Sequence, residues 1–151
     1  MAEPGAVASF LEGDGRDSRG RTVFDVLSMN DADLERTHDF IQWLFPLPER
    51  SAAVPDAPVL TADDTETIRA STMAQCALAA ATDRMAAFYA TTPHWLAPHD
   101  HNHLRITRII RSLRLLSGEE QADAFKSLVM ARVEATRAPV NARSLGYWAT
   151  A

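Results

Sequence analysis

Proline and glycine punctuation divides this sequence into segments of helical length, and it constrains the fold more than any other feature. Between the punctuated loops, apolar residues recur every three or four positions, and no two-residue alternation is long enough to predict a sheet. A single amphipathic helix cannot bury its own apolar stripe, so several must pack together. The sequence therefore predicts an all-α protein, a single compact helical bundle of five to seven helices with Pro/Gly-rich connecting loops. The loops are marked by Gly13, Gly15, Gly20, Pro46, Pro48, Pro55, Pro58, Pro93, Pro98 and Pro139.

Capping signals indicate where these helices begin. Asn30 or Asp31 predicts the start of a helix that continues to Phe45, and Ser117 with Glu120 predicts a capping box for a helix that ends near Ala135. The other expected helices cover about 6–12, 23–29, 61–70, 72–90 and 102–116, and the last three are opened by Thr61 with Asp64, by Ser71, and by Asp100 or Asn102. We expect one helical domain over 1–138 and a tail over 139–151. The tail either folds back over Trp43 or pairs with a second copy, which would make a homodimer.

Charge and cysteine content exclude several classes of function. The 151 residues carry 15 basic and 20 acidic side chains, a net charge of -5, so binding to nucleic acid is not expected. The one cysteine, Cys76, excludes an intramolecular disulfide and a thiolate metal cluster, and its Ala-rich surroundings predict an inert core position. The first eleven residues do not resemble a signal peptide, and the longest apolar run is far too short to span a bilayer. We therefore expect a cytoplasmic protein with no membrane partner.

His38 is the first candidate for a functional residue. On a wheel of the predicted 30–45 helix it lies about 20° beyond Phe45, at the edge of the apolar stripe. A histidine there loses hydration and needs a partner for each ring nitrogen, either as a structural residue or as an acid/base or ligand contact in a pocket wall. Gln42 borders the same stripe. Trp43 faces the opposite side, where the tail, another subunit or a ligand would have to cover it.

The predicted 102–116 helix carries a second set of candidates. Its arginines drift around the wheel, and Arg105 comes closest to the apolar edge, so we expect it to be the most buried. A buried guanidinium needs a carboxylate or an anionic ligand. Arg108 and Arg111 lie near the far face, where they form either a solvated, salt-bridged surface or contacts to phosphate. The apolar stripe is Ile106, Ile109, Ile110, Leu113 and Leu116, and the acidic candidates for Arg105 are Glu35, Asp39 and Asp83.

Histidines cluster just before that helix. His99 and His103 would share a helical face, and His99, His101 and His103 would align on an extended segment, so either conformation could present imidazoles to a metal. The sequence has no HExxH pattern, and this metal site is the less specific candidate. In the competing interpretation, Asp100 or Asn102 caps the helix and the imidazoles form hydrogen bonds around it.

Two stretches are specific enough to indicate a family. ERTHDFIQWLFPLPE (Glu35–Glu49) and HNHLRITRIIRSLRLL (His101–Leu116) resemble the conserved domain of the opioid growth factor receptor family. DSRGRT (Asp17–Thr22) and DRMAAFY (Asp83–Tyr89) are similar to intervening parts of that domain, in the same order. The resemblance covers about 10–135, and the chain looks like a single-domain, bacterial-type member. The positions that match are His38, Ile41, Gln42, Trp43, Phe45, Pro46, His101, Asn102, Arg105, Thr107 and Arg108.

The resemblance implies an all-helical domain, and animal members are described as receptors for the opioid growth factor peptide, associated with the nucleus. Our main hypothesis is a helical ligand-binding module in which the His38 and His101 helices form a groove for a small anionic or peptide-like ligand. The alternative is a small enzyme in which His38 or His101 transfers protons, less specifically with a metal or haem. The sequence identifies no cofactor. The binding candidates are Gln42, Trp43, Asn102, Arg105 and Arg108.

Overall fold

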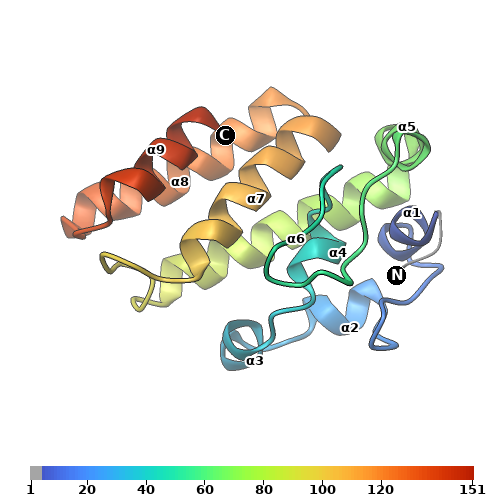
Figure 1. The fold of residues 1–151 in the computed structure, drawn as a ribbon, viewed down its shortest axis with the longest axis horizontal. Coiled ribbons are helices and arrows are strands. Elements are labelled where there is room, and N and C mark those ends of the chain that lie inside the picture. Colours follow the sequence, from blue (N-terminus) through green and yellow to red (C-terminus); the bar gives the residue numbers. More distant parts are fainter. Residues whose placement is uncertain (1–4) are drawn as a thin grey trace. The chain divides into compact units, whose positions relative to one another are not determined.

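The computed structural model describes residues 5–151, and all regular secondary structure within them is helical (Figure 1). This confirms the all-α prediction. The described residues form nine helices, two more than the longest expected series, because the 30–45 segment contains two helices and the 139–151 segment contains a further one. The helices are α1 (Ala6–Leu11), α2 (Val23–Leu27), α3 (Asp31–Arg36), α4 (Ile41–Leu44), α5 (Ala62–Ala70), α6 (Thr72–Thr91), α7 (Asn102–Leu116), α8 (Glu119–Thr136) and α9 (Ala142–Thr150).

The chain divides into two compact units, Met1–Ala81 and Thr82–Ala151, and the division falls within α6. We refer to them as unit 1 and unit 2. Unit 1 holds the short helices α1–α4 together with α5, and unit 2 holds α7, α8 and α9. No helix of residues 5–151 combines the length and the apolar character that crossing a membrane requires.

Capping residues begin the helices of unit 1 largely as the sequence predicts. Thr61 accepts a hydrogen bond from the Asp64 N–H, the Asp64 carboxylate accepts one from the Thr61 N–H, and the Asn30 side chain accepts one from the Asp33 N–H. These bonds satisfy donors that a helix otherwise leaves unpaired at its first turn. Helix α1 then packs against both α4 and α5, and its Phe10 is completely buried.

The predicted 30–45 helix is wrong in one respect, because it breaks after α3. Thr37 adopts an extended conformation (φ −95°, ψ 124°), and its N–H bonds to the Asp33 carbonyl as the last hydrogen bond of that helix. The break changes the helical phase, and Phe40 and Trp43 both become buried. His38 lies in the break and is exposed, so a wheel drawn through a continuous helix could not place it.

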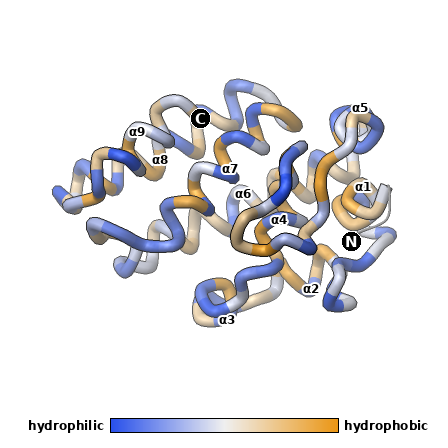
Figure 2. The backbone as a smooth tube through the Cα atoms, viewed as in Figure 1, coloured by the Kyte–Doolittle hydropathy of each residue, from blue (hydrophilic) through white to orange (hydrophobic). Residues whose placement is uncertain are grey.

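Unit 2 is built on the apolar stripe of α7. All five predicted stripe residues are at most 3% exposed, and α7 packs against α8 and α9. Apolar and polar residues are interleaved along these helices (Figure 2). The expected Ser117 capping box does not form; Gly118 is the N-cap of α8, without a side-chain cap, and its φ of +111° lies in a region that other residues rarely adopt. Glycine at this position allows a two-residue connection between α7 and α8.

The 139–151 segment contains α9, which docks on α7. Asn141 caps the helix by accepting a hydrogen bond from the Ser144 N–H. Trp148 is completely buried, and its indole Nε1–H donates to the His103 carbonyl at 3.0 Å. Cys76, expected in the core, is instead exposed on α6, because the small alanines around it lie on several sides of that helix.

Candidate functional site

A pocket of about 660 Å³ opens on unit 1 between the 16–19 loop, α4 and the 54–57 loop. Its volume lies within the range that small-molecule and peptide pockets occupy. The wall is mixed in character, because charged residues of both signs stand beside apolar ones. The lining residues are Ala6, Arg16, Asp17, Ser18, Arg19, Asp39, Trp43, Val54, Asp56 and Ala57.

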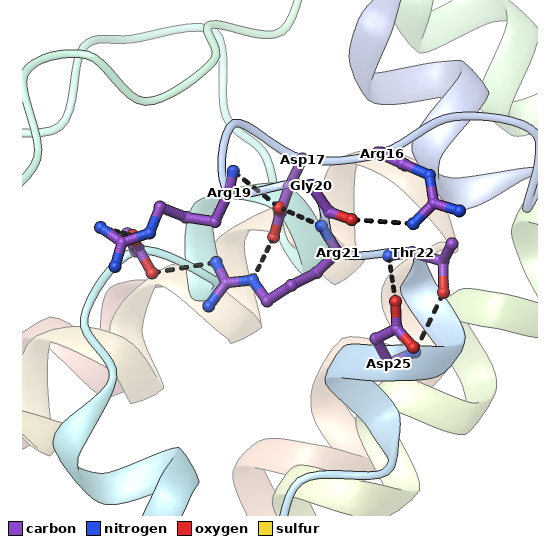
Figure 3. A network of polar contacts seen from close by, with 8 residues as sticks. Arg16, Asp17, Arg19, Gly20, Arg21, Thr22 and Asp25 are labelled. Carbon is purple, nitrogen blue, oxygen red and sulfur yellow. Dashed lines mark hydrogen bonds and ion pairs between the residues drawn. The ribbon is translucent and has the colours of Figure 1, made fainter.

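The buried carboxylate of Asp17 organises the loop on one side of the pocket (Figure 3). Its Oδ1 accepts hydrogen bonds from the backbone N–H groups of Arg19 and Arg21, each at 2.9 Å. Its Oδ2 accepts one from Arg21 Nε at 2.6 Å, and its side chain is 0% exposed. A charged acceptor that collects several donors in this way fixes the shape of a turn.

Arg21 connects this loop to the segment before α4. Its Nη2 donates to Asp39 Oδ1 at 2.9 Å, while Arg19 Nη1 lies 3.6 Å from Asp39 Oδ2. Burial lowers the pKa of Arg21, but hydrogen bonds and attraction from Asp17 and Asp39 outweigh it, so the pKa lies above its ordinary value. The guanidinium is therefore a permanent positive charge between two carboxylates.

The loop ends in the cap of α2, which holds it from the other side (Figure 3). The Thr22 N–H donates to Asp25 Oδ2 at 2.8 Å, and the Asp25 N–H donates to Thr22 Oγ1 at 3.1 Å. The backbone and side-chain hydrogen bonds of Thr22 lower the pKa of Asp25 below its usual range. The pocket loop is thus held between a buried salt bridge and a helix cap.

Trp43 forms the aromatic part of the wall. It is 3% exposed, and its ring centroid lies 5.4 Å from that of Phe10. Phe10 therefore covers part of the indole, for which the sequence predicted a cover from the tail, another subunit or a ligand. An indole beside charged groups suits a ligand that is partly apolar and partly polar.

The other candidates of unit 1 lie apart from the pocket lining. Gln42 is buried in α4, where its Nε2 lies 3.5 Å from Ser51 Oγ and its Oε1 has no hydrogen-bond partner. His38 is exposed in the break between α3 and α4, so the expected desolvated histidine is wrong. Of the three sequence candidates in unit 1, the structure brings only Trp43 to the pocket.

The candidates of unit 2 gather at the start of α7. Asn102 is completely buried: its Oδ1 accepts from the Tyr89 hydroxyl at 3.1 Å, and its Nδ2 donates to Asp100 Oδ1 at 2.9 Å. Arg105 is 6% exposed and the most buried of the α7 arginines, as predicted, while Arg108 is half-buried. His101 is exposed, with its Nδ1 3.9 Å from Asp100 Oδ1. The expected groove would join residues of both units, and it stays a prediction.

The three-histidine arrangement is contradicted. His103 is buried, its Nε2–H donates to the Trp95 carbonyl at 2.8 Å, and its Nδ1 lies 3.0 Å from Ser144 Oγ. Both nitrogens are therefore engaged within the protein. His99 and His101 are exposed and precede the first turn of α7, so no shared helical face exists. Among residues 5–151, no three His, Cys, Asp or Glu side chains are grouped closely enough to hold a metal ion.

Sequence reasoning missed most of the pocket. The polar loop was visible as a loop, and DSRGRT was visible as a motif, but nothing in either shows that the Asp17 carboxylate is buried. One signal was available: an aspartate followed by two arginines and a glycine can fold into a turn around its own carboxylate. Asp56 and Ala57 lie in a proline-flanked loop whose position depends on tertiary packing.

The fold and pocket define this chain as an all-helical domain with an open pocket that carries both charge signs. Residues 21–94 match the opioid growth factor receptor (OGFr) conserved region. Over this segment, just under half of its length, the chain is similar to that family. The matched segment includes the Glu35–Glu49 motif and ends before the His101–Leu116 motif.

The relatives are much longer proteins. The chain is 35% identical over 98 residues to the opioid growth factor receptor of Mus musculus, covering 53% of this chain and 15% of the mouse protein. It is also 35% identical over 98 residues to the opioid growth factor receptor of Rattus norvegicus, covering 53% of this chain and 17% of the rat protein. The chain thus spans less than a fifth of each receptor. No solved structure matches it.

Proposed function

We propose that this chain is a ligand-binding module whose unit 1 pocket takes a short peptide-like ligand. The observation that carries the proposal is the lining itself, in which Trp43 stands beside carboxylates and guanidiniums in a space of about 660 Å³. The names of the mouse and rat relatives, receptors for an opioid growth factor, support ligand binding as the activity.

The charges favour a ligand with both an ammonium and a carboxylate group over a simple anion. Asp17 is fully engaged by its own loop, and Asp39 is shared by Arg19 and Arg21. Asp56 is exposed on the opposite loop, and no residue in the described part of the chain pairs with it. It is the natural acceptor for a ligand ammonium group.

The guanidiniums of Arg16 and Arg19 provide the complementary contact. Arg16 Nη1 donates to the Gly20 carbonyl, and Arg19 has a side chain that is 70% exposed. Both keep N–H donors free to bind a ligand carboxylate. The apolar part of the wall then accommodates a side chain between the two charged ends.

Calorimetric titration of the full chain tests this proposal, with the opioid growth factor peptide and a mixed pool of free pentapeptides as probes. We expect saturable binding of at least one probe, weakened at least fivefold by Asp56→Asn or Arg19→Gln. Whichever peptide binds should bind at least fivefold more weakly when its amino terminus is acetylated and its carboxyl terminus is amidated, because these changes remove both terminal charges.

Two exposed residues of α5 that do not line the pocket serve as matched controls, Asp63→Asn and Arg69→Gln. They change the same charges and should leave the affinity unchanged. The proposal is wrong if neither probe binds saturably, or if the α5 variants weaken binding as much as the pocket variants do.

A further inference from the structure

A second and smaller cavity lies within unit 2, between the C-terminal half of α6 and α8, with a volume of about 110 Å³. Three aromatic residues line it, and Tyr89, Trp95 and Phe125 are each at most 2% exposed. The Tyr89 ring meets Trp95 at 5.3 Å and Phe125 at 6.3 Å, in both cases nearly edge to face. Rings that pack against one another in this way form a rigid, preformed apolar surface.

Helix α8 supplies one side of the cavity. Phe125, Leu128, Val129 and Arg132 follow one another at helical spacing and therefore share a face. Leu128 is 60% exposed at the rim. On the opposite side, the small side chains of Ala86 and Ala90 leave the space open.

Arg132 is the charged residue of this lining. Its Nε is buried without a hydrogen-bond partner, and its guanidinium makes no hydrogen bond or ion pair with any described residue. A buried donor left unsatisfied destabilises a protein by about 1–3 kcal/mol, so it calls for an acceptor. The neighbouring rings do not supply this acceptor in the structure: the Tyr89 hydroxyl is turned to Asn102, to which it donates, and the indole Nε1–H of Trp95 is only a donor, bonded to the Tyr89 carbonyl.

We propose that this cavity binds a small aromatic monocarboxylate. At about 110 Å³ the cavity is smaller than an apolar cavity of about 150 Å³ that is known to hold benzene, so a single ring is the largest group that it can take. The ligand ring packs on Tyr89, Trp95 and Phe125, and its carboxylate accepts hydrogen bonds from Nε and one Nη of Arg132. Guanidinium and carboxylate groups fit each other in this two-point manner. A purely apolar ligand of the same shape would leave Nε unsatisfied, and a neutral one with a single hydroxyl would lack the charge and the second acceptor oxygen of a carboxylate. The site is separate from the unit 1 pocket and does not depend on its function.

Benzoate is the probe, titrated into the full chain by calorimetry and by chemical-shift mapping of the amide and indole N–H signals. We expect saturable binding with shifts at Trp95 and along α8. Benzyl alcohol, which has the ring without the charge, and acetate, which has the charge without the ring, should each bind at least fivefold more weakly than benzoate.

Two variants locate the site. Arg132→Gln should weaken benzoate binding about tenfold, while Ala86→Leu should abolish it by filling the cavity. Arg111→Gln removes the same charge from an exposed position on α7 and should have no effect. Because the Arg132 guanidinium has no partner to lose, its replacement should not disturb folding, which the thermal midpoint of each variant checks. Absence of saturable benzoate binding would overturn the proposal. Equal benzoate affinity of the Arg132→Gln variant and the wild-type protein would also overturn it.

Discussion

Two clusters of arginine and aspartate use the same ion-pair chemistry in opposite surroundings. In unit 1, Arg21 stands between Asp17 and Asp39, and the side chains of Asp17 and Arg21 are 0% and 18% exposed. In unit 2, Arg114 pairs with Glu119 and Asp123, whose side chains are 75% and 61% exposed. The first cluster shapes a loop beside a pocket, and the second links the facing ends of α7 and α8.

The pKa values of the two arginines show how the surroundings matter. Both lie above the ordinary value, but for Arg21 the largest influence is burial, which opposes the shift, whereas for Arg114 it is the hydrogen bond to Asp123, which favours it. A buried pair must recover a desolvation cost through well-formed hydrogen bonds, and an exposed pair has little cost and little to gain. Losing one partner should therefore be harmful in unit 1 and almost harmless in unit 2.

The largest expected effect comes from removing the buried carboxylate. Asp17→Ala should lower the free energy of unfolding by about 3 kcal/mol, because it leaves Arg21 and two backbone N–H groups without their acceptor. Asp17→Asn keeps one acceptor oxygen and should cost roughly half as much. Urea denaturation measures both, and Asp123→Ala is the control, whose effect should be much smaller. Equal losses at positions 17 and 123 would contradict the contrast.

A pair of histidines extends the comparison beyond carboxylates. His103→Leu should cost about 2 kcal/mol, since it leaves the buried Trp95 carbonyl without a donor. His101→Ala, at an exposed position two residues earlier, should leave the denaturation midpoint unchanged. The same variants test the hypothesis of a histidine enzyme. Because His38 and His101 are both exposed, a loss of activity on their replacement would not result from unfolding. A stable His103→Leu protein would show that the imidazole is not a structural residue.

Local rules predicted the helices well wherever a capping residue and an apolar stripe agreed. Helix α5 is capped by Thr61 and ends at Ala70 as expected, and α7 ends at Leu116 with its stripe buried. The α3–α4 break was missed because no proline or glycine marks Thr37; the break is favoured by the burial of Phe40 and Trp43. That gain is a tertiary one, and a helical wheel does not contain it.

The candidate site was less predictable for a related reason. Arg105 was expected to be buried from its position beside an apolar stripe, and it is. Asp17 precedes any helix, so no periodicity reports on its environment, and its burial follows from the loop closing around it. The pattern within one helix thus predicts which of its residues are buried, whereas a pocket formed between loops can be described only from the folded structure.

A smaller effect is expected at the outer edge of the unit 1 cluster. Asp39→Asn should lower the free energy of unfolding by about 1 kcal/mol, because the side chain is 25% exposed and water replaces part of what Arg21 loses. Sodium chloride at high concentration should reduce this difference more than it reduces the Asp17 effect, since screening acts chiefly on exposed charges. Urea denaturation at low and high salt measures both. If salt reduced the effect of the Asp17 substitution more than that of the Asp39 substitution, Asp39 would have to be the more buried carboxylate. That result would contradict the structure.

The smallest effect concerns two exposed aspartates whose pKa values are lowered for different reasons. Hydrogen bonds from Thr22 lower the pKa of Asp25, and a hydrogen bond from Arg114 lowers that of Asp123. A carboxyl group whose pKa is lowered in the folded state stabilises the protein at any pH above its unfolded-state pKa of about 3.9. This stabilisation is lost as the pH falls through the folded-state pKa. Carboxyl-carbon NMR titration should show Thr22→Val raising only the pKa of Asp25 and Arg114→Gln raising only that of Asp123. Added salt should raise the pKa of Asp123 more, because its shift includes attraction to two cations, Arg114 and Lys126, whereas the Asp25 shift comes chiefly from the Thr22 hydrogen bonds, and attraction to Arg16 is its smallest cause. If added salt raised both pKa values equally, the helix cap of Asp25 and the ion pair of Asp123 would be equally sensitive to screening. That result would contradict the prediction.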